Sequence, residues 1–88
     1  MIERTVTICN KAGMHTRPAA ALVKTAAKFK AEFNIKKDAF EINGKSIIGV
    51  MTLAAEKGSS LLLKFDGPDE EAAAAAVVEL IERGFDEE

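Results

Sequence analysis

The stretch EFNIKKDAFEING, residues 32–44, carries the clearest fold signal in the sequence. Apolar residues alternate with polar ones over 32–36 and again over 40–42, and Lys37-Asp38 separates the two runs. A period of two is typical of strands that bury one face, and a short polar break between two such runs predicts a hairpin. Asn43-Gly44 ends the second run with residues that favour turns. The sequence therefore predicts an antiparallel pair of strands near its centre.

The segments on both sides of this hairpin predict two more strands and three helices. Residues 5–8 and 61–65 alternate in the same way as the hairpin strands. Apolar residues recur at helical spacing over 16–29, 47–53 and 73–81. We expect Ser46 to cap the second helix and Asp69-Glu70-Glu71 to supply acid to the first turn of the third. Gly84 is expected to stop the third helix, and residues 86–88 to form a frayed acidic tail.

This order of elements predicts the fold class. Strand, helix, strand, strand, helix, strand and helix follow one another, and the helices and strands mostly have one apolar face each. Helices that pack on one side of a largely antiparallel sheet satisfy this pattern, so we expect a two-layer α+β fold. A chain of 88 residues has room for one such core, and we expect residues 1–88 to form a single domain.

The composition argues against several classes of function. A net charge of −2 and the lack of Tyr and Trp disfavour a nucleic-acid-binding surface. One cysteine permits neither an intrachain disulfide nor a thiolate metal cluster, and a lone histidine without clustered acids argues against a metal site. No apolar run reaches the length of a membrane span. We therefore expect a soluble cytoplasmic protein with no metal, no cofactor and no membrane contact.

The motif GMHTRPA, residues 13–19, lies where a loop is expected to enter a helix. The first amide N–H groups of a helix, here those of Thr16 and Arg17, have no intrahelical acceptors, and the helix dipole adds positive potential. This position therefore suits an anion such as phosphate, and the Arg17 guanidinium adds forked donors that match phosphate oxygens. Positive potential also favours the neutral form of the His15 ring, whose lone pair can attack phosphorus. The pattern predicts covalent phosphoryl transfer through His15.

The residues alone leave other interpretations open. His15 as a surface or capping residue and Arg17 as a solvated helix residue fit the same pattern. Ser46 as an ordinary helix cap, without any regulatory role, also fits.

The longer motif GMHTRPAA, residues 13–20, closely resembles the active-site signature of the HPr family. These are the histidine-containing phosphocarriers of the bacterial phosphoenolpyruvate-dependent phosphotransferase system. The resemblance spans essentially the whole chain and implies an open-faced sandwich, with three helices over a four-stranded antiparallel sheet in the order βαββαβα. It also implies that enzyme I phosphorylates the delta nitrogen of His15 and that IIA domains receive the group. Such a protein is a stoichiometric carrier, not an enzyme, and we expect a monomer.

The segment NGKSIIGVM, residues 43–51, also resembles this family. Its Ser46 matches the position that an ATP-dependent HPr kinase/phosphorylase modifies in some relatives. Ile47, Ile48 and Met51 are one, three and four positions apart, and so short a helix cannot turn all three toward the core. Part of an apolar patch therefore stays near solvent. The resemblance implies that this patch and the start of the first helix dock enzyme I and the IIA acceptors. Basic residues around the patch would speed its encounter with an acidic partner. The expected docking residues are Thr16, Arg17, Ala20, Ile47, Ile48 and Met51, and the expected basic residues are Arg17, Lys24 and Lys45.

Two segments resemble different branches of the family. The ending RGFDEE, residues 83–88, is similar to the nitrogen-related branch, whose carrier is called NPr. The segment around Ser46 is similar to regulated carriers of the sugar branch, so sugar uptake and regulation are alternative uses of the phosphoryl group. A second hypothesis is a regulatory binding module that docks through the apolar patch and is controlled by Ser46. The presence of His15 with Arg17 favours the carrier.

Overall fold

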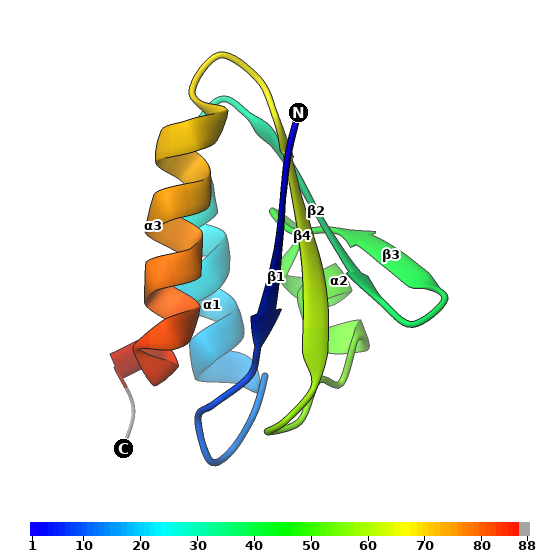
Figure 1. Ribbon diagram of the computed structural model, residues 1–88. Coiled ribbons are helices and arrows are strands. Elements are labelled where there is room, and N and C mark those ends of the chain that lie inside the picture. The colour runs from blue at the N-terminus through cyan, green and yellow to red at the C-terminus, as the bar shows by residue number, and fades with distance from the viewer. Residues whose placement is uncertain (87–88) are drawn as a thin grey trace.

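The computed structural model describes residues 1–86, in which three helices cover one face of a four-stranded sheet (Figure 1). This confirms the predicted two-layer α+β fold and the predicted order of elements. The elements are β1 (Ile2–Thr7), α1 (Thr16–Ala26), β2 (Glu32–Lys37), β3 (Phe40–Asn43), α2 (Ile47–Thr52), β4 (Ser60–Asp66), α3 (Glu70–Glu82) and a terminal 3₁₀ turn (Gly84–Asp86).

The sheet has the strand order β1-β4-β2-β3, and all neighbouring strands are antiparallel. β2 and β3 form the predicted hairpin, in which Lys37 pairs with Phe40 across a two-residue turn. Asp38 in this turn has a φ of 55°, a left-handed conformation that aspartate tolerates better than most residues. β1 and β3 form the two edges of the sheet. Because α3 packs on β1 and α2 packs on β3, these two helices lie toward opposite edges.

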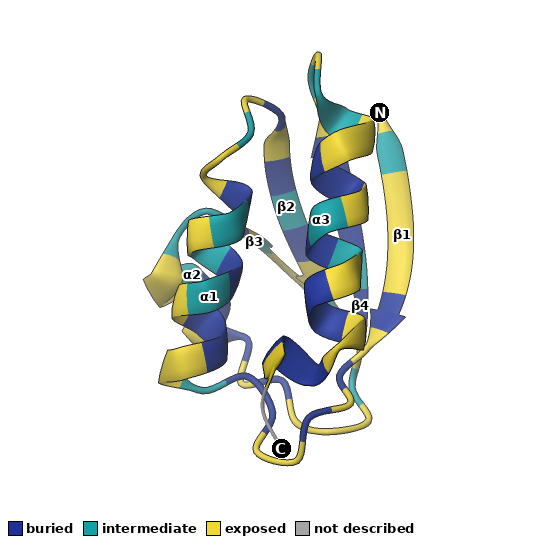
Figure 2. Ribbon diagram, turned by 90° about the vertical axis from the view of Figure 1, so that its left-hand side faces the viewer, coloured by how far each residue is buried: buried dark blue, intermediate teal, exposed yellow. Residues whose placement is uncertain are grey.

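The core fills the space between the helices and the sheet. Figure 2 shows buried residues on the faces where the two layers meet. Phe33 of β2 and Phe65 of β4 stack with their ring centroids 4.7 Å apart. In α3, the small side chains of Ala73 and Ala74 are buried, which lets this helix lie close to the sheet. Other fully buried side chains are Ile8, Leu22, Ile35, Val50, Leu61, Leu63, Val77 and Ile81.

Two element boundaries differ from the prediction by three residues, and each lies beside a contact that is distant in sequence. β1 begins at Ile2, not at residue 5, and Ile2 pairs with Phe65 at the far end of β4. α1 ends at Ala26, not at residue 29. Beyond it, the Asp69 carboxylate accepts the N–H groups of residues 30 and 31, both at 2.8 Å, and fixes the path into β2. The bond from the Lys30 N–H is the main cause that lowers the pKa of Asp69.

The C-terminal segment is more ordered than expected. Gly84 has a φ of 70° and follows α3 as the predicted stop. Arg83 Nε donates to Asp86 Oδ1 at 2.9 Å, and this bond lowers the pKa of Asp86. The expected frayed tail is therefore wrong for Asp86, and residues 87–88 lie outside the described residues.

In residues 1–86, no helix is both long enough and apolar enough to cross a bilayer.

Candidate functional site

His15 stands at the N-cap position of α1, where the sequence predicts it. Its backbone is extended, with φ −114° and ψ −166°, and its C=O accepts the N–H of Ala19 at 2.9 Å. The side chain is half-buried and forms no capping bond to the helix. The amide N–H groups of Thr16 and Arg17, which have no acceptors within the helix, thus begin α1 directly beside this residue.

Backbone contacts hold the loop that carries His15. The Met14 N–H donates to the C=O of Ala55 at 2.7 Å, and the buried Asn10 side chain donates to the C=O of Gly13 at 2.8 Å. Gly13 has a φ of 74°, and a Cβ added there would lie 2.7 Å from the Ala55 oxygen. The loop therefore closes against the connection between α2 and β4 because position 13 is glycine.

The N-terminus of α1 is a positively charged environment. Thr16 and Arg17 are exposed in the first turn, which contains no acidic residue. Arg17 forms no salt bridge with another residue of 1–86, so no described carboxylate occupies its guanidinium donors. Helix N–H groups and a guanidinium at one place can hold a phosphoryl group on the ring. Within the same described range, no cluster of three His, Cys, Asp or Glu side chains is placed to bind a metal.

Ser46 caps α2 as predicted. Its Oγ accepts the N–H of Gly49 at 3.1 Å, and its C=O accepts the N–H of Val50 at 2.9 Å. The Ser46 side chain is half-buried and partly accessible to solvent. The capping role is confirmed, and phosphorylation of Ser46 stays a prediction.

The exposed apolar side chains of α2 form a patch beside α1. Val50 is fully buried, while Ile48 is 76% exposed. The apolar patch that the sequence predicts is therefore present, because this short helix buries Val50 and cannot also turn its other apolar side chains inward. We call this set the α2 patch: Ile47 (38% exposed), Ile48 (76%) and Met51 (42%).

α1 and α2 pack in opposite directions. Ala55, which follows α2, meets Met14 just before α1, so the end of α2 lies near the start of α1. Ser46, at the start of α2, consequently lies toward the far end of α1, which is 11 residues and about 16 Å long. Thr16, Arg17 and Ala20 of α1 are exposed, as is the α2 patch on the helix that packs beside it. Ser46 and His15 are at opposite ends of this helix pair.

Lys45 has a structural contact besides the positive charge that the sequence places near the docking surface, together with Arg17 and Lys24. Its Nζ donates to the C=O of Phe29 at 2.7 Å, and its side chain is half-buried. Lys45 thus connects the start of α2 to the segment after α1, while Arg17 and Lys24 remain exposed.

Sequence reasoning missed the residues whose backbone and side chains hold the loop before His15 in place. Ala54 has a φ of 51°, a left-handed conformation that costs alanine about 1–2 kcal/mol, and the next C=O receives the Met14 N–H. Asn10 also supports the loop, because its C=O accepts the Gly13 N–H at 3.1 Å in addition to its side-chain bond. A polar residue three positions before a glycine is a turn signal that could have identified Asn10. Ala54 carries no such signal.

Comparison with known proteins assigns the chain to a family. The family described as "PTS HPr component phosphorylation site" matches residues 2–83. The chain belongs to the HPr family. Phosphocarrier protein HPr of Treponema pallidum is 44% identical over 88 residues, which covers 100% of both chains. Phosphocarrier protein NPr of Escherichia coli is 40% identical and covers 99% of this chain and 98% of its own. A crystal structure of HPr from Thermoanaerobacter tengcongensis superposes with a TM-score of 0.96 at 46% identity, covering 100% of this chain and 99% of that one.

Family membership confirms the predicted class of function. This HPr-family chain is a stoichiometric phosphocarrier of the phosphotransferase system, not a catalyst. Membership of this family implies that its partners are other proteins of that system. Relatives of both branches match, since HPr and NPr proteins align along nearly the whole chain at similar identity.

Proposed function

We propose that His15 accepts a phosphoryl group from enzyme I, with phosphoenolpyruvate as its source, and passes it to IIA-type acceptors. The observation that carries this proposal is the placement of His15 at the N-terminus of α1 beside Arg17. The family's description as a phosphorylation site supports it. The reacting atoms belong to the ring and the donor phosphoryl group, so the transfer needs no cofactor.

The transfer is an attack by the neutral His15 ring. The Nδ1 lone pair forms a bond to phosphorus while the bond between phosphorus and the donor breaks, and that electron pair returns to the donor. The N–H groups of Thr16 and Arg17, together with the Arg17 guanidinium, attract the negative charge that arrives on the ring. Release to a IIA acceptor repeats the step with the acceptor as nucleophile, and the His15 ring recovers its lone pair.

Both partners use the face formed by α1 and α2. The α2 patch offers apolar area beside Thr16 and Ala20, which are exposed on α1. Arg17 and Lys24 add positive charge on the same helix, and such charge speeds the encounter with an acidic partner. One shared surface fits a carrier because donor and acceptor must both reach His15, and so must bind in turn.

A reconstituted relay tests the proposal. Enzyme I, phosphoenolpyruvate and a IIA protein are mixed with a small amount of the chain, and phosphoryl groups on the IIA protein are counted over time. The wild-type chain should phosphorylate many IIA molecules, and His15→Ala should phosphorylate none. A His15→Ala chain that supports the relay would overturn the assignment. Parallel reactions with sugar-branch and nitrogen-branch IIA proteins show which branch this carrier serves.

Ser46 is a second, regulatory proposal. Its half-buried hydroxyl adjoins the α2 patch, so a phosphate there would add negative charge to the docking face. The helix N-terminus tolerates that charge, so α2 need not unfold. HPr kinase/phosphorylase with ATP should modify the wild type and not Ser46→Ala, and the modified chain should accept phosphate at His15 more slowly. An unchanged rate would refute regulation; modification at Ser46 without any at His15 would favour the regulatory binding module.

The remaining expectations concern assembly and location. We expect the carrier to act in the cytoplasm as a monomer. A crystal structure of an HPr dimer from Thermoanaerobacter tengcongensis, 46% identical with a TM-score of 0.80, is the specific alternative. It covers 99% of this chain and 100% of its own. Light scattering after size-exclusion chromatography decides between the two: the mass of one chain supports the monomer, and twice that mass refutes it.

A further inference from the structure

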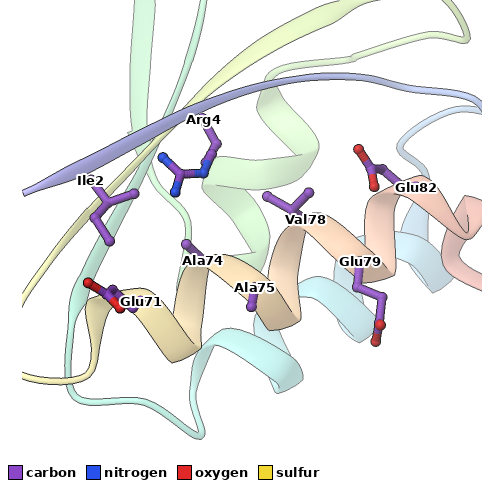
Figure 3. Close-up of a pocket in the computed structure, with 8 residues that line it drawn as sticks. All are labelled: Ile2, Arg4, Glu71, Ala74, Ala75, Val78, Glu79 and Glu82. Atoms are coloured by element: carbon purple, nitrogen blue, oxygen red, sulfur yellow. The ribbon is translucent and has the colours of Figure 1, made fainter.

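A surface groove of about 600 Å³ runs between β1 and α3 (Figure 3). Side chains of β1 reach across it toward α3, small apolar side chains of α3 form its floor, and acidic side chains lie toward its two ends. β1 is an edge strand, so no further strand blocks access from that side. The main lining residues are Ile2, Arg4, Glu71, Ala74, Val78 and Glu82.

Two carboxylates in this groove have no ionic partner among residues 1–86. Glu79 is bound by Arg83 at 2.8 Å, whereas Glu71 and Glu82 form no salt bridge with a described residue. Arg4 donates to the backbone C=O of residue 3 at 2.9 Å. The groove thus presents two acidic groups that have no ionic partner among residues 1–86, with apolar side chains and the Arg4 side chain between them.

The surroundings reinforce the negative charge. Residues 69–86 contain six acidic residues and one basic residue, whereas residues 1–68 contain six acidic and eleven basic residues. The described part of the chain from residue 69 onward therefore carries a formal charge of −5, against +5 for residues 1–68. A field of this sign attracts basic partners and repels the acidic partners that the α1–α2 face attracts.

We infer that the β1–α3 groove binds a basic segment of another protein, with two Lys or Arg residues about 16 Å apart and apolar side chains between them. The spacing follows from the helix, because Glu71 and Glu82 are eleven positions apart on one face and each residue rises about 1.5 Å. The apolar side chains of the segment cover Ala74 and Val78, and its basic side chains reach the two free carboxylates.

Such a partner leaves the phosphoryl-transfer face open. α3 packs on β1 at one edge of the sheet, and α2 packs on β3 at the other (Figure 2). The carrier can therefore be held through its acidic groove by one protein while it exchanges phosphoryl groups with another. This inference is independent of the residue that is phosphorylated.

The test uses a synthetic helical peptide with two lysines about eleven positions apart and leucines between them on the same face. Titration into the ¹⁵N-labelled full chain at low salt should shift amide signals of β1 and α3. The double variant Glu71→Gln/Glu82→Gln should bind about fivefold more weakly, as expected for two exposed charge contacts. The matched control Glu32→Gln/Asp38→Asn removes the same charge from exposed positions on β2 and its turn and should keep wild-type affinity.

Four results would overturn the inference: no binding, shifts confined to α1 and α2, equal loss in the control variant, or equal binding of a peptide with glutamines in place of the lysines. Loss confined to the Glu71→Gln/Glu82→Gln variant supports it. That variant should also accept phosphate from enzyme I at the wild-type rate, because neither residue lies on the α1–α2 face. A slowed rate would contradict the claimed separation of the two surfaces.

Discussion

The loop before His15 closes against the α2–β4 connection through Gly13, so Gly13→Ala should strain both segments. The φ of 74° costs an alanine about 1–2 kcal/mol, and a Cβ placed 2.7 Å from the Ala55 oxygen adds an overpacking cost of about 1–3 kcal/mol. A stiffer unfolded chain offsets about 0.4–1 kcal/mol. The expected net loss in the free energy of unfolding is about 3 kcal/mol, a large part of the roughly 5–15 kcal/mol typical of a domain.

Gly58 supplies the matched control. It also has a positive φ, 94°, but a Cβ added there meets no atom within 4 Å. Gly58→Ala therefore carries the conformational cost without the overpacking, and should lose only about 1 kcal/mol. Urea denaturation of both variants and the wild type, followed by circular dichroism, gives the two losses directly.

The difference between the two variants isolates the close approach to Ala55. Gly13→Ala should exceed Gly58→Ala by about 2 kcal/mol, and it should also slow phosphoryl acceptance under conditions where the chain is folded, because the Met14 bond to Ala55 must shift. Losses that agree within about 0.5 kcal/mol would refute the reasoning, since that is the scatter expected of independent substitutions. Such a result would mean that the loop moves to accommodate the added methyl group at no measurable cost in stability.

Three further predictions concern the helix cap, acid stability and the docking face. Ser46→Ala removes the cap on the Gly49 N–H and should lower the free energy of unfolding in urea by about 1 kcal/mol, whereas a loss below about 0.3 kcal/mol would deny the cap. The hydrogen bond from the Lys30 N–H is the main cause of the lowered pKa of Asp69. Asp69 therefore stabilises the folded state fully above its unfolded pKa of about 4, and this stabilisation is lost as pH falls through the lower folded pKa. Asp69→Asn should therefore flatten the acid limb of a stability–pH curve, and an unchanged limb would contradict this. Ile48→Ala should change stability by less than about 0.5 kcal/mol but raise the KM of enzyme I for the carrier, and an unchanged KM would remove this side chain from the interface.

The sequence predicts well those features that depend on local periodicity. Alternation over residues 32–42 identifies the β2–β3 hairpin because each strand buries one face. The capping role of Ser46 can be predicted because it is local: its Oγ accepts the N–H of Gly49, only three residues ahead in the sequence. The position of His15 at a helix start is local in the same way, since the loop residues and Pro18 mark where α1 begins.

Features set by contacts between distant segments could not be predicted in this way. α1 ends early, and Asp69, from the other half of the chain, binds the backbone just beyond that end. The engagement of Lys45 by the Phe29 carbonyl depends on how α2 packs against α1. The same holds for Ala55, whose carbonyl supports the His15 loop only once the α2–β4 connection is in place. No periodicity in the sequence encodes these pairings.

The most direct test of the phosphoryl-carrier assignment is the intact mass of the chain after incubation with phosphoenolpyruvate and purified enzyme I. Wild type and His15→Ala are compared, with Ser46→Ala as the matched control at the other candidate position. We predict that wild type and Ser46→Ala each gain one acid-labile phosphoryl group and that His15→Ala gains none. A phosphoryl group on His15→Ala, or none on the wild type with several sources of enzyme I, would contradict the assignment.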